Sequence, residues 1–122
     1  MIRVLLANHP AMIPDAIRQL LDEQEDMEVV GDVRGPMKIL QEVGRTQADA
    51  VVLIQDGIDE PGLCSQLLAV YPDVTILCLR CDRGAFTRQL CSQRRDIVDI
   101  ENESIVRAFR TIVQERCRET EN

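Results

Sequence analysis

The sequence has almost no aromatic residues and almost no lysine. Two Phe, one Tyr and no Trp occur in 122 residues, Lys38 is the sole lysine, and the formal charge at pH 7 is −7. Proteins that bind nucleic acids use basic patches to neutralise phosphates and aromatic rings to stack on bases. We therefore do not expect this chain to bind DNA or RNA directly.

Long apolar runs are also missing, because no stretch approaches the roughly 20 residues that a membrane-crossing helix needs. The N-terminal segment MIRVLLANHP has neither the apolar length nor the cleavage site of a signal peptide. The five cysteines are an odd number with irregular spacing, which is typical of reduced thiols and not of a disulfide framework. We expect a cytoplasmic protein that does not contact a membrane.

The composition is sufficient for one compact domain. Hydrophobic residues make up 45% of the chain and charged residues 29%, and a chain of this length has room for one hydrophobic core. We predict a single domain over residues 1–118, followed by a polar C-terminal tail at 119–122.

Apolar runs alternate with helical periodicity along the chain. The runs predict strands at 2–6, 27–33, 49–54 and 74–79, and a weaker fifth strand at 96–100. Apolar spacing and proline or glycine boundaries predict helices at 14–21, 36–44 and 62–71, a short fourth helix at 85–93, and a last helix at 104–117. Five strands alternating with five helices are typical of an α/β fold, in which helices cover both faces of a parallel sheet.

The polarity of the strands predicts their order in the sheet. The first, third and fourth strands are apolar on both faces, as central strands are, whereas the second and fifth carry acidic residues and suit sheet edges. This distribution favours a five-stranded parallel sheet of order 2-1-3-4-5, as in flavodoxin-like proteins. Ligands of such sheets bind beyond the carboxyl ends of the central strands, so the expected site lies where residues 7–8, 54–55 and 80–81 converge.

Four segments give the chain a resemblance to the receiver domains of two-component response regulators, close to the NarL/LuxR class: MIRVLLANHP, DMEVVGDV, ADAVVLIQDGIDEPGL and YPDVTILCL. The resemblance covers essentially the whole chain and is clearest up to Leu79. It implies that an aspartate at the end of the third strand accepts a phosphoryl group and binds Mg²⁺ together with acids at the end of the first strand. It also implies a Thr or Ser after the fourth strand and a Lys after the fifth, both contacting the phosphoryl oxygens.

The residues at these positions lack the required chemistry. The two acid positions correspond to Ala7 and Asn8, and the phosphoacceptor position corresponds to Ile54. The Thr or Ser position corresponds to Arg80, and the lysine position to Val98. The chain therefore resembles a receiver with a degenerate phosphorylation pocket, and we expect no enzymatic activity, no metal and no cofactor.

The acidic loop after the third strand leaves alternatives open. Asp56 lies two residues beyond Ile54, a displacement of about 6.6 Å at about 3.3 Å per residue. It is a displaced phosphoacceptor only if the loop folds back. Alternatively, Arg80 pairs with Asp56 and holds the pocket in one state, or the acids belong to an ordinary solvated turn.

The cysteines and the last helix supply the remaining candidate residues. A thiol redox sensor is an alternative function, in which Cys81 reacts together with Cys91 or Cys64, whereas Cys78 lies within a strand and is expected to be buried. Receivers use the face formed by their fourth helix, fifth strand and fifth helix for dimers and outputs. The resemblance places four charged residues on or beside that face: Asp96, Asp99, Arg107 and Arg110.

The function that we predict is that of a phosphorylation-independent, receiver-like signalling module that acts through contacts with a second copy or with another protein. Two alternatives remain: phosphorylation at Asp56, and redox sensing. A small ligand in place of phosphate is compatible with the first function, but no residue pattern supports one.

Overall fold

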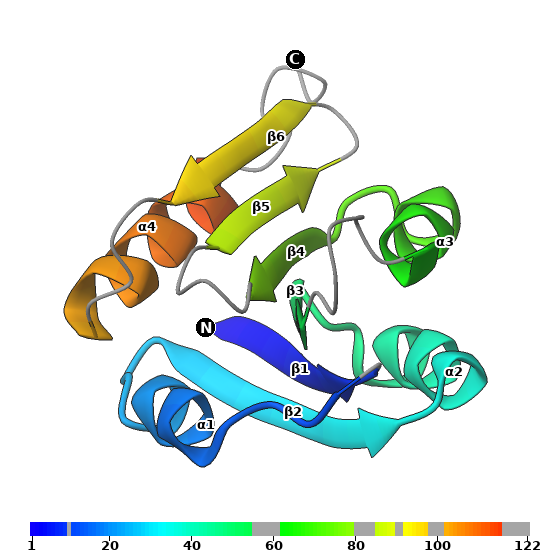
Figure 1. Cartoon of the computed structure of the whole chain (residues 1–122), viewed down its shortest axis with the longest axis horizontal. Helices are drawn as coiled ribbons and strands as arrows, with labels where there is room; N and C mark the ends of the chain where they lie inside the picture. The colour runs from blue at the N-terminus through cyan, green and yellow to red at the C-terminus, as the bar shows by residue number, and fades with distance from the viewer. Residues whose placement is uncertain (10, 55–61, 80–84, 90–91, 98–101, 116–122) are drawn as a thin grey trace.

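The computed structural model of the chain describes all residues except 10, 55–61, 80–84, 90–91, 98–101 and 116–122 (Figure 1). The chain folds into one sheet of order β2-β1-β3-β4-β5-β6 with helices on both faces. Its elements are β1 (Ile2–Asn8), α1 (Asp15–Asp22), β2 (Met27–Arg34), α2 (Pro36–Thr46), β3 (Ala50–Ile54), α3 (Gly62–Val70), β4 (Thr75–Leu79), β5 (Ala85–Gln89), β6 (Ser92–Ile97) and α4 (Asn102–Glu115).

The first four strands form a parallel sheet of order 2-1-3-4, as the sequence predicts. β1 pairs with β2 on one side and with β3 on the other, and β3 pairs with β4. Every residue of β4 is buried, as are all residues of β3 except the partly buried Ile54. The continuous apolar runs of these strands therefore reflect burial on both faces of the sheet, and the arrangement is compatible with the flavodoxin-like class.

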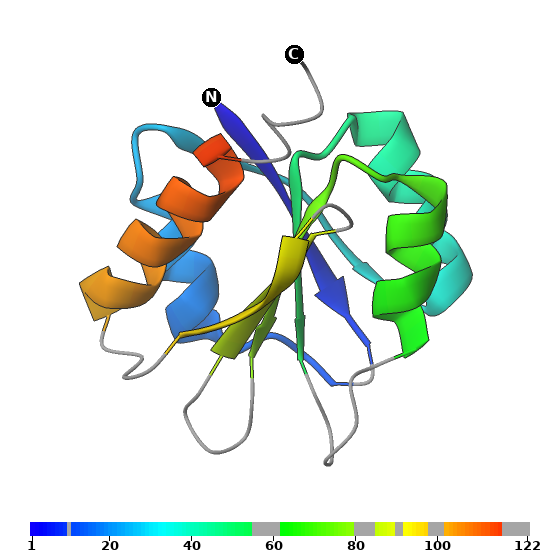
Figure 2. The same ribbon diagram turned by 90° about the horizontal axis from the view of Figure 1, so that it is seen from above.

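Helices cover the two faces of the sheet in pairs. Figure 2 shows α1 and α4 on one face and α2 and α3 on the other. On the first face Leu6 and Val52 pack in one cluster with Phe109 of α4, which is fully buried. On the opposite face Leu53 belongs to a second cluster, which Ile39 of α2 joins. Neighbouring residues of a strand thus belong to different cores, as the alternation of side chains requires.

The prediction of a fourth helix at 85–93 is wrong, because residues 85–89 form β5 and pair antiparallel with β4. β6 then pairs antiparallel with β5. A short isolated helix is marginal in water, whereas a strand placed beside β4 satisfies the backbone groups at the edge of that strand. This pairing is the physical reason for the difference.

The fifth parallel strand predicted at 96–100 is not shown either. Residues 96 and 97 end the antiparallel strand β6, and residues 98–100 lie outside the described part of the chain. Among the helices described, none is long and apolar enough to cross a membrane.

Candidate functional site

The carboxyl edge of the parallel sheet is where the resemblance places phosphorylation chemistry, and two of the positions concerned are occupied by the apolar residues Ala7 and Ile54. Ala7 is fully buried and belongs to the core beneath α2 and α3. Ile54, the last residue of β3, is partly buried and packs against the core beneath α1 and α4. Neither side chain has an atom that can bind Mg²⁺ or accept a phosphoryl group, and both contribute to packing.

Asn8, the last residue of β1, uses its side chain within the fold. Its Oδ1 accepts a hydrogen bond from the backbone N–H of Ile13 at 2.8 Å. Its Nδ2 donates to the backbone carbonyl of Val33 at 3.2 Å and to the carboxylate of Asp32. Asn8 therefore connects the loop after β1 to the neighbouring strand β2, and its carbonyl oxygen is already engaged.

An ion pair continues this network on the far side of Asp32. The second oxygen of Asp32 lies 2.8 Å from Nε of Arg18, and Nη1 of Arg18 lies 2.6 Å from Asp15. The carboxylate on β2 thus lies beside a guanidinium group from α1 that it shares with Asp15, and its other oxygen contacts the Asn8 amide. Sequence reasoning missed Asp32 and Arg18, because their sequence separation gives no sign that they meet.

Several predicted site residues lie outside the described part of the chain, so the structure does not bear on them. They are Asp56, Arg80, Cys81, Cys91, Val98 and Asp99. Their roles as displaced acceptor, pocket ion pair, redox pair and interaction surface stay predictions. Of the other cysteines, Cys64 and Cys78 are buried, as expected for Cys78; burial makes Cys64 a poor redox partner for Cys81. No group of three or more metal-ligating side chains occurs among the residues that the structure describes.

The two arginines of α4 that were predicted to belong to the interaction face have different environments. Arg107 is exposed, and Asp96 lies in β6. Arg110 instead forms contacts within the fold. Its guanidinium donates to both carboxylate oxygens of Asp26, and the distance from Nη2 to Oδ1 is 3.0 Å. Nη2 also donates to Oε1 of Gln24 at 2.9 Å. The hydrogen bonds from Arg110 hold the pKa of Asp26 below its usual value, against a smaller opposing effect of burial. Arg110 thereby fixes α4 to the segment that leads into β2.

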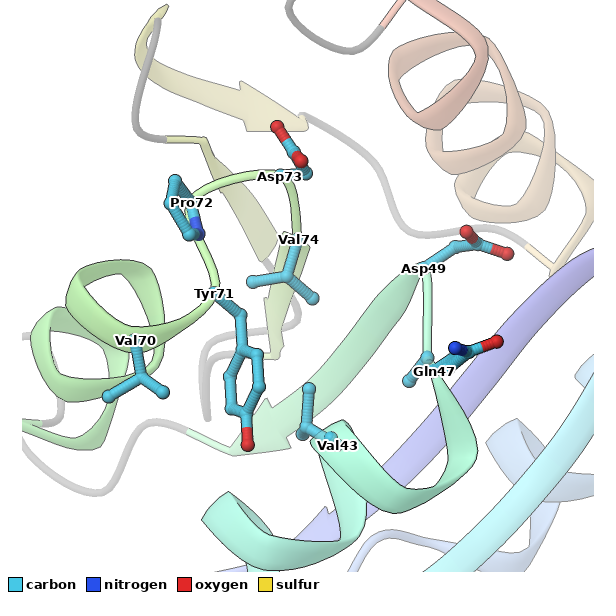
Figure 3. A pocket seen from close by; sticks show the side chains of 10 residues that line it. Val43, Gln47, Asp49, Val70, Tyr71, Pro72, Asp73 and Val74 are labelled. Carbon is cyan, nitrogen blue, oxygen red and sulfur yellow. The ribbon is translucent and has the colours of Figure 1, made fainter.

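A cleft of about 390 Å³ lies at the opposite, amino edge of the sheet (Figure 3). It is lined by the C-terminal ends of α2 and α3 and by the segments that lead into β3 and β4. Val43, Tyr71 and Val74 contribute apolar surface, and Asp49 and Asp73 contribute carboxylates. Sequence reasoning missed this cleft because its two halves, 43–49 and 70–74, are far apart in the chain and each looks like an ordinary helix end.

Comparison with protein-family models and with curated proteins returns no match for this chain.

Proposed function

We propose that this chain is a phosphorylation-independent signalling module with a receiver-like fold, and that it acts in the cytoplasm by binding a second copy of itself or another protein. The parallel 2-1-3-4 sheet covered by two pairs of helices supports the receiver-like part of this proposal. The antiparallel hairpin of β5 and β6 departs from the fifth parallel strand that receivers have.

The observation that carries the proposal is the side chain of Asn8. At a position where the resemblance calls for a metal-binding acid, this amide connects Ile13 to β2 through both of its polar atoms. A Mg²⁺ ion requires several oxygen ligands in near-octahedral geometry. The Asn8 oxygen already accepts a hydrogen bond, and the side chains of its neighbours Ala7 and Ile54 have no ligand atom, so these three side chains do not provide the set of acids that binds Mg²⁺ in receivers.

The ion pair between Arg18 and Asp32 is a second observation that argues against a Mg²⁺ site at this edge. An acid at this edge that is available to bind a metal would need a free oxygen. One oxygen of Asp32 contacts Arg18 at 2.8 Å and the other contacts the Asn8 amide. The positive charge that a metal supplies in a receiver is supplied near this edge by a permanent guanidinium.

Intact-mass spectrometry after incubation with acetyl phosphate and Mg²⁺ tests the proposal. We expect the mass of the chain to stay unchanged while a functional receiver in the same tube gains one phosphoryl group. Asp56→Asn is the matched variant for the alternative. A phosphorylated species that is present in the natural chain and missing in Asp56→Asn would overturn the proposal in favour of a displaced acceptor.

The binding part of the proposal is tested by multi-angle light scattering of the purified chain and by affinity capture from the source cells. We expect a concentration-dependent dimer or a specific co-purifying protein, in either case insensitive to acetyl phosphate. A strictly monomeric chain that captures nothing above the background of an unrelated bait would contradict the binding function.

A further inference from the structure

The guanidinium of Arg34, at the end of β2, is directed to the sulfur of Met12 in the segment between β1 and α1. Its Nε donates to Sδ of Met12 at 3.2 Å, and its Nη2 donates to the same atom at 2.9 Å. A thioether sulfur is a weak hydrogen-bond acceptor, whereas the fork of a guanidinium matches the oxygens of carboxylates and phosphates. The contact therefore joins two strong donors to an acceptor that is poorly suited to them.

Arg34 has no ion pair with a carboxylate among the residues that the structure describes. The neighbouring acid on β2, Asp32, already contacts Arg18 and the Asn8 amide. Carboxylates pair with four other arginines, namely Arg3, Arg18, Arg45 and Arg110. The guanidinium of Arg34 thus keeps its capacity to bind a stronger acceptor at the position of the Met12 sulfur.

The side chain of Met12 is open to reagents in solution. It is 49% exposed, whereas Met27 is 4% exposed. The remaining two of the four methionines, Met1 and Met37, are 77% and 69% exposed, but no hydrogen bond to their sulfur occurs in the described part of the chain. Oxidation converts a thioether into a sulfoxide, which carries a polar oxygen. Among the methionines, Met12 combines exposure with donors already directed to its sulfur.

We propose that Met12 is a site of reversible oxidation by hydrogen peroxide, and that Arg34 binds the sulfoxide oxygen. A lone pair of the sulfur forms a bond to one peroxide oxygen as the O–O bond breaks. The other oxygen leaves as hydroxide and takes the proton of the transferred oxygen, so one water is released. The sulfur loses two electrons and the peroxide gains them. Methionine sulfoxide reductases return the sulfoxide to the thioether. This modification goes beyond the proposed protein-binding function and does not depend on it.

Oxidation should strengthen the link between β2 and the segment before α1. Ile13, the next residue after Met12, is buried, and its N–H donates to Asn8, so this segment is already attached to the end of β1. A hydrogen bond from a guanidinium to an oxygen is charge-assisted and stronger than one to a thioether sulfur. Sulfoxides usually disrupt the packing of a fold, whereas at Met12 the new oxygen meets a donor pair. We therefore expect oxidation of Met12 to stabilise the chain.

The test treats the natural chain with hydrogen peroxide and follows the sulfoxide at each methionine by peptide mass mapping. We expect Met12 to be oxidised and the buried Met27 to stay reduced. The midpoint of urea unfolding should then rise, and exchange of the Arg34 Nε–H with water should slow about threefold, as for a charged hydrogen bond at an exposed position. Reductases specific for the two sulfoxide epimers should reverse both changes.

Two pairs of variants assign the effect. Met12→Leu should abolish the rise of the midpoint on oxidation, whereas Met37→Leu, which removes a more exposed methionine, should retain it. Arg34→Ala should abolish the rise although Met12 is still oxidised. Arg107→Ala removes an exposed arginine of α4 and should retain the rise. Circular dichroism verifies that each variant is folded before oxidation.

Three results would overturn the proposal. The first is a Met12 that stays reduced under conditions that oxidise Met37 completely. The second is an unfolding midpoint that is unchanged or lower in the oxidised natural chain. The third is a rise that persists in Met12→Leu or in Arg34→Ala. None of these results changes the outcome of the phosphorylation test, so the two proposals can fail separately.

Discussion

The side-chain oxygen of Asn8 accepts a hydrogen bond from the backbone N–H of Ile13, at 2.8 Å. This bond holds the segment that leads from β1 to α1 against the carboxyl edge of the sheet. It places a structural amide at a position where the resemblance to receivers calls for an acid that binds metal. The same residue cannot serve both purposes without a loss of stability or of metal binding.

Asn8→Asp is expected to destabilise the fold by about 1–3 kcal/mol, although it introduces the acid that the resemblance calls for. The substitution removes the Nδ2 donor and places a second carboxylate beside Asp32 and the carbonyl of Val33. Urea unfolding measures the change. Adding Asp32→Asn should recover part of the loss, since the amide introduced on β2 can then donate to the carboxylate introduced on β1. A double variant as unstable as the sum of both singles would contradict this account of the contact.

Ile54→Asp tests whether one missing carboxylate is the only defect. Because Ile54 packs partly buried against the core, the variant should lose about 1–3 kcal/mol of unfolding free energy, whereas Ile54→Val should lose about 0.5–1.5 kcal/mol. Incubation of Ile54→Asp with acetyl phosphate and Mg²⁺ should still leave its mass unchanged, because Ala7 and Asn8 provide no free ligand. Phosphorylation of this variant would mean that the edge retains a working pocket.

Gly44→Ala is expected to lower the stability of the natural chain but not that of a chain in which Tyr71 has lost its hydroxyl. A Cβ atom added at Gly44 would lie 2.7 Å from the Tyr71 hydroxyl oxygen and no closer than 3.4 Å to the ring carbons. Gly44→Ala should therefore break the hydrogen bond from Tyr71 to Leu40 and cost about 1 kcal/mol, despite the better helix propensity of alanine.

Tyr71→Phe removes the clashing hydroxyl, so Gly44→Ala should be neutral or stabilising by up to about 1 kcal/mol in that background. Thermal and urea unfolding of the two single variants and the double variant provide the cycle. If the losses of the two single variants add in the double variant, the Tyr71 hydroxyl is not what makes alanine unfavourable at residue 44.

The ion pair between Arg110 and Asp26 predicts a dependence on pH. In the folded state the pair lowers the pKa of Asp26 below its ordinary value of 3.8. The contribution of the pair to the free energy of unfolding is therefore complete above pH 3.8 and is lost as the pH falls through the lower pKa of the folded state. Asp26→Asn should cost about 0.5–1 kcal/mol at pH 7, since the groups are 31% and 41% exposed and solvent screens them.

Unfolding at a series of pH values checks this linkage. The stability difference between the natural chain and Asp26→Asn should shrink below pH 3.8. Asp22→Asn, at the exposed end of α1, should show no such convergence. A difference that is constant across the whole acid range would mean that Asp26 contributes through packing and not through its charge.

The sequence was sufficient to predict the parallel part of the sheet for a physical reason. β3 and β4 are buried on both faces, and such strands are apolar at nearly every position, which makes them visible as short continuous runs. The helix starts were visible as well, because Pro36 stands at the first turn of α2.

The hairpin of β5 and β6 could not be found in the same way. The segment AFTRQLCSQ has no proline or glycine, and Leu90-Cys91 between the two strands carries none of the Asn-Gly or Gly signals that mark tight hairpins. Its pairing with β4 depends on tertiary context, which overrides local propensity.

At the candidate sites the sequence indicated which chemistry is missing and gave little sign of what replaces it. The lack of ligand atoms at Ala7 and Ile54 is a property of the residue types alone. The role of Asn8 depends on partners at Asp32 and Val33, which only the pairing of β1 with β2 brings near. Asparagine followed by a loop does indicate side-chain hydrogen bonding to nearby backbone, and this signal could have identified the bond to Ile13.

We expect the carboxyl edge of this sheet to bind neither Mg²⁺ nor a phosphoryl group. The most direct measurement is an amide chemical-shift titration of the natural chain with Mg²⁺ and with beryllofluoride, an analogue of the phosphoryl group. The shifts of Asn8, Ile54 and Leu79 should stay unchanged at concentrations that saturate a functional receiver. Saturable shifts at these three residues would contradict it.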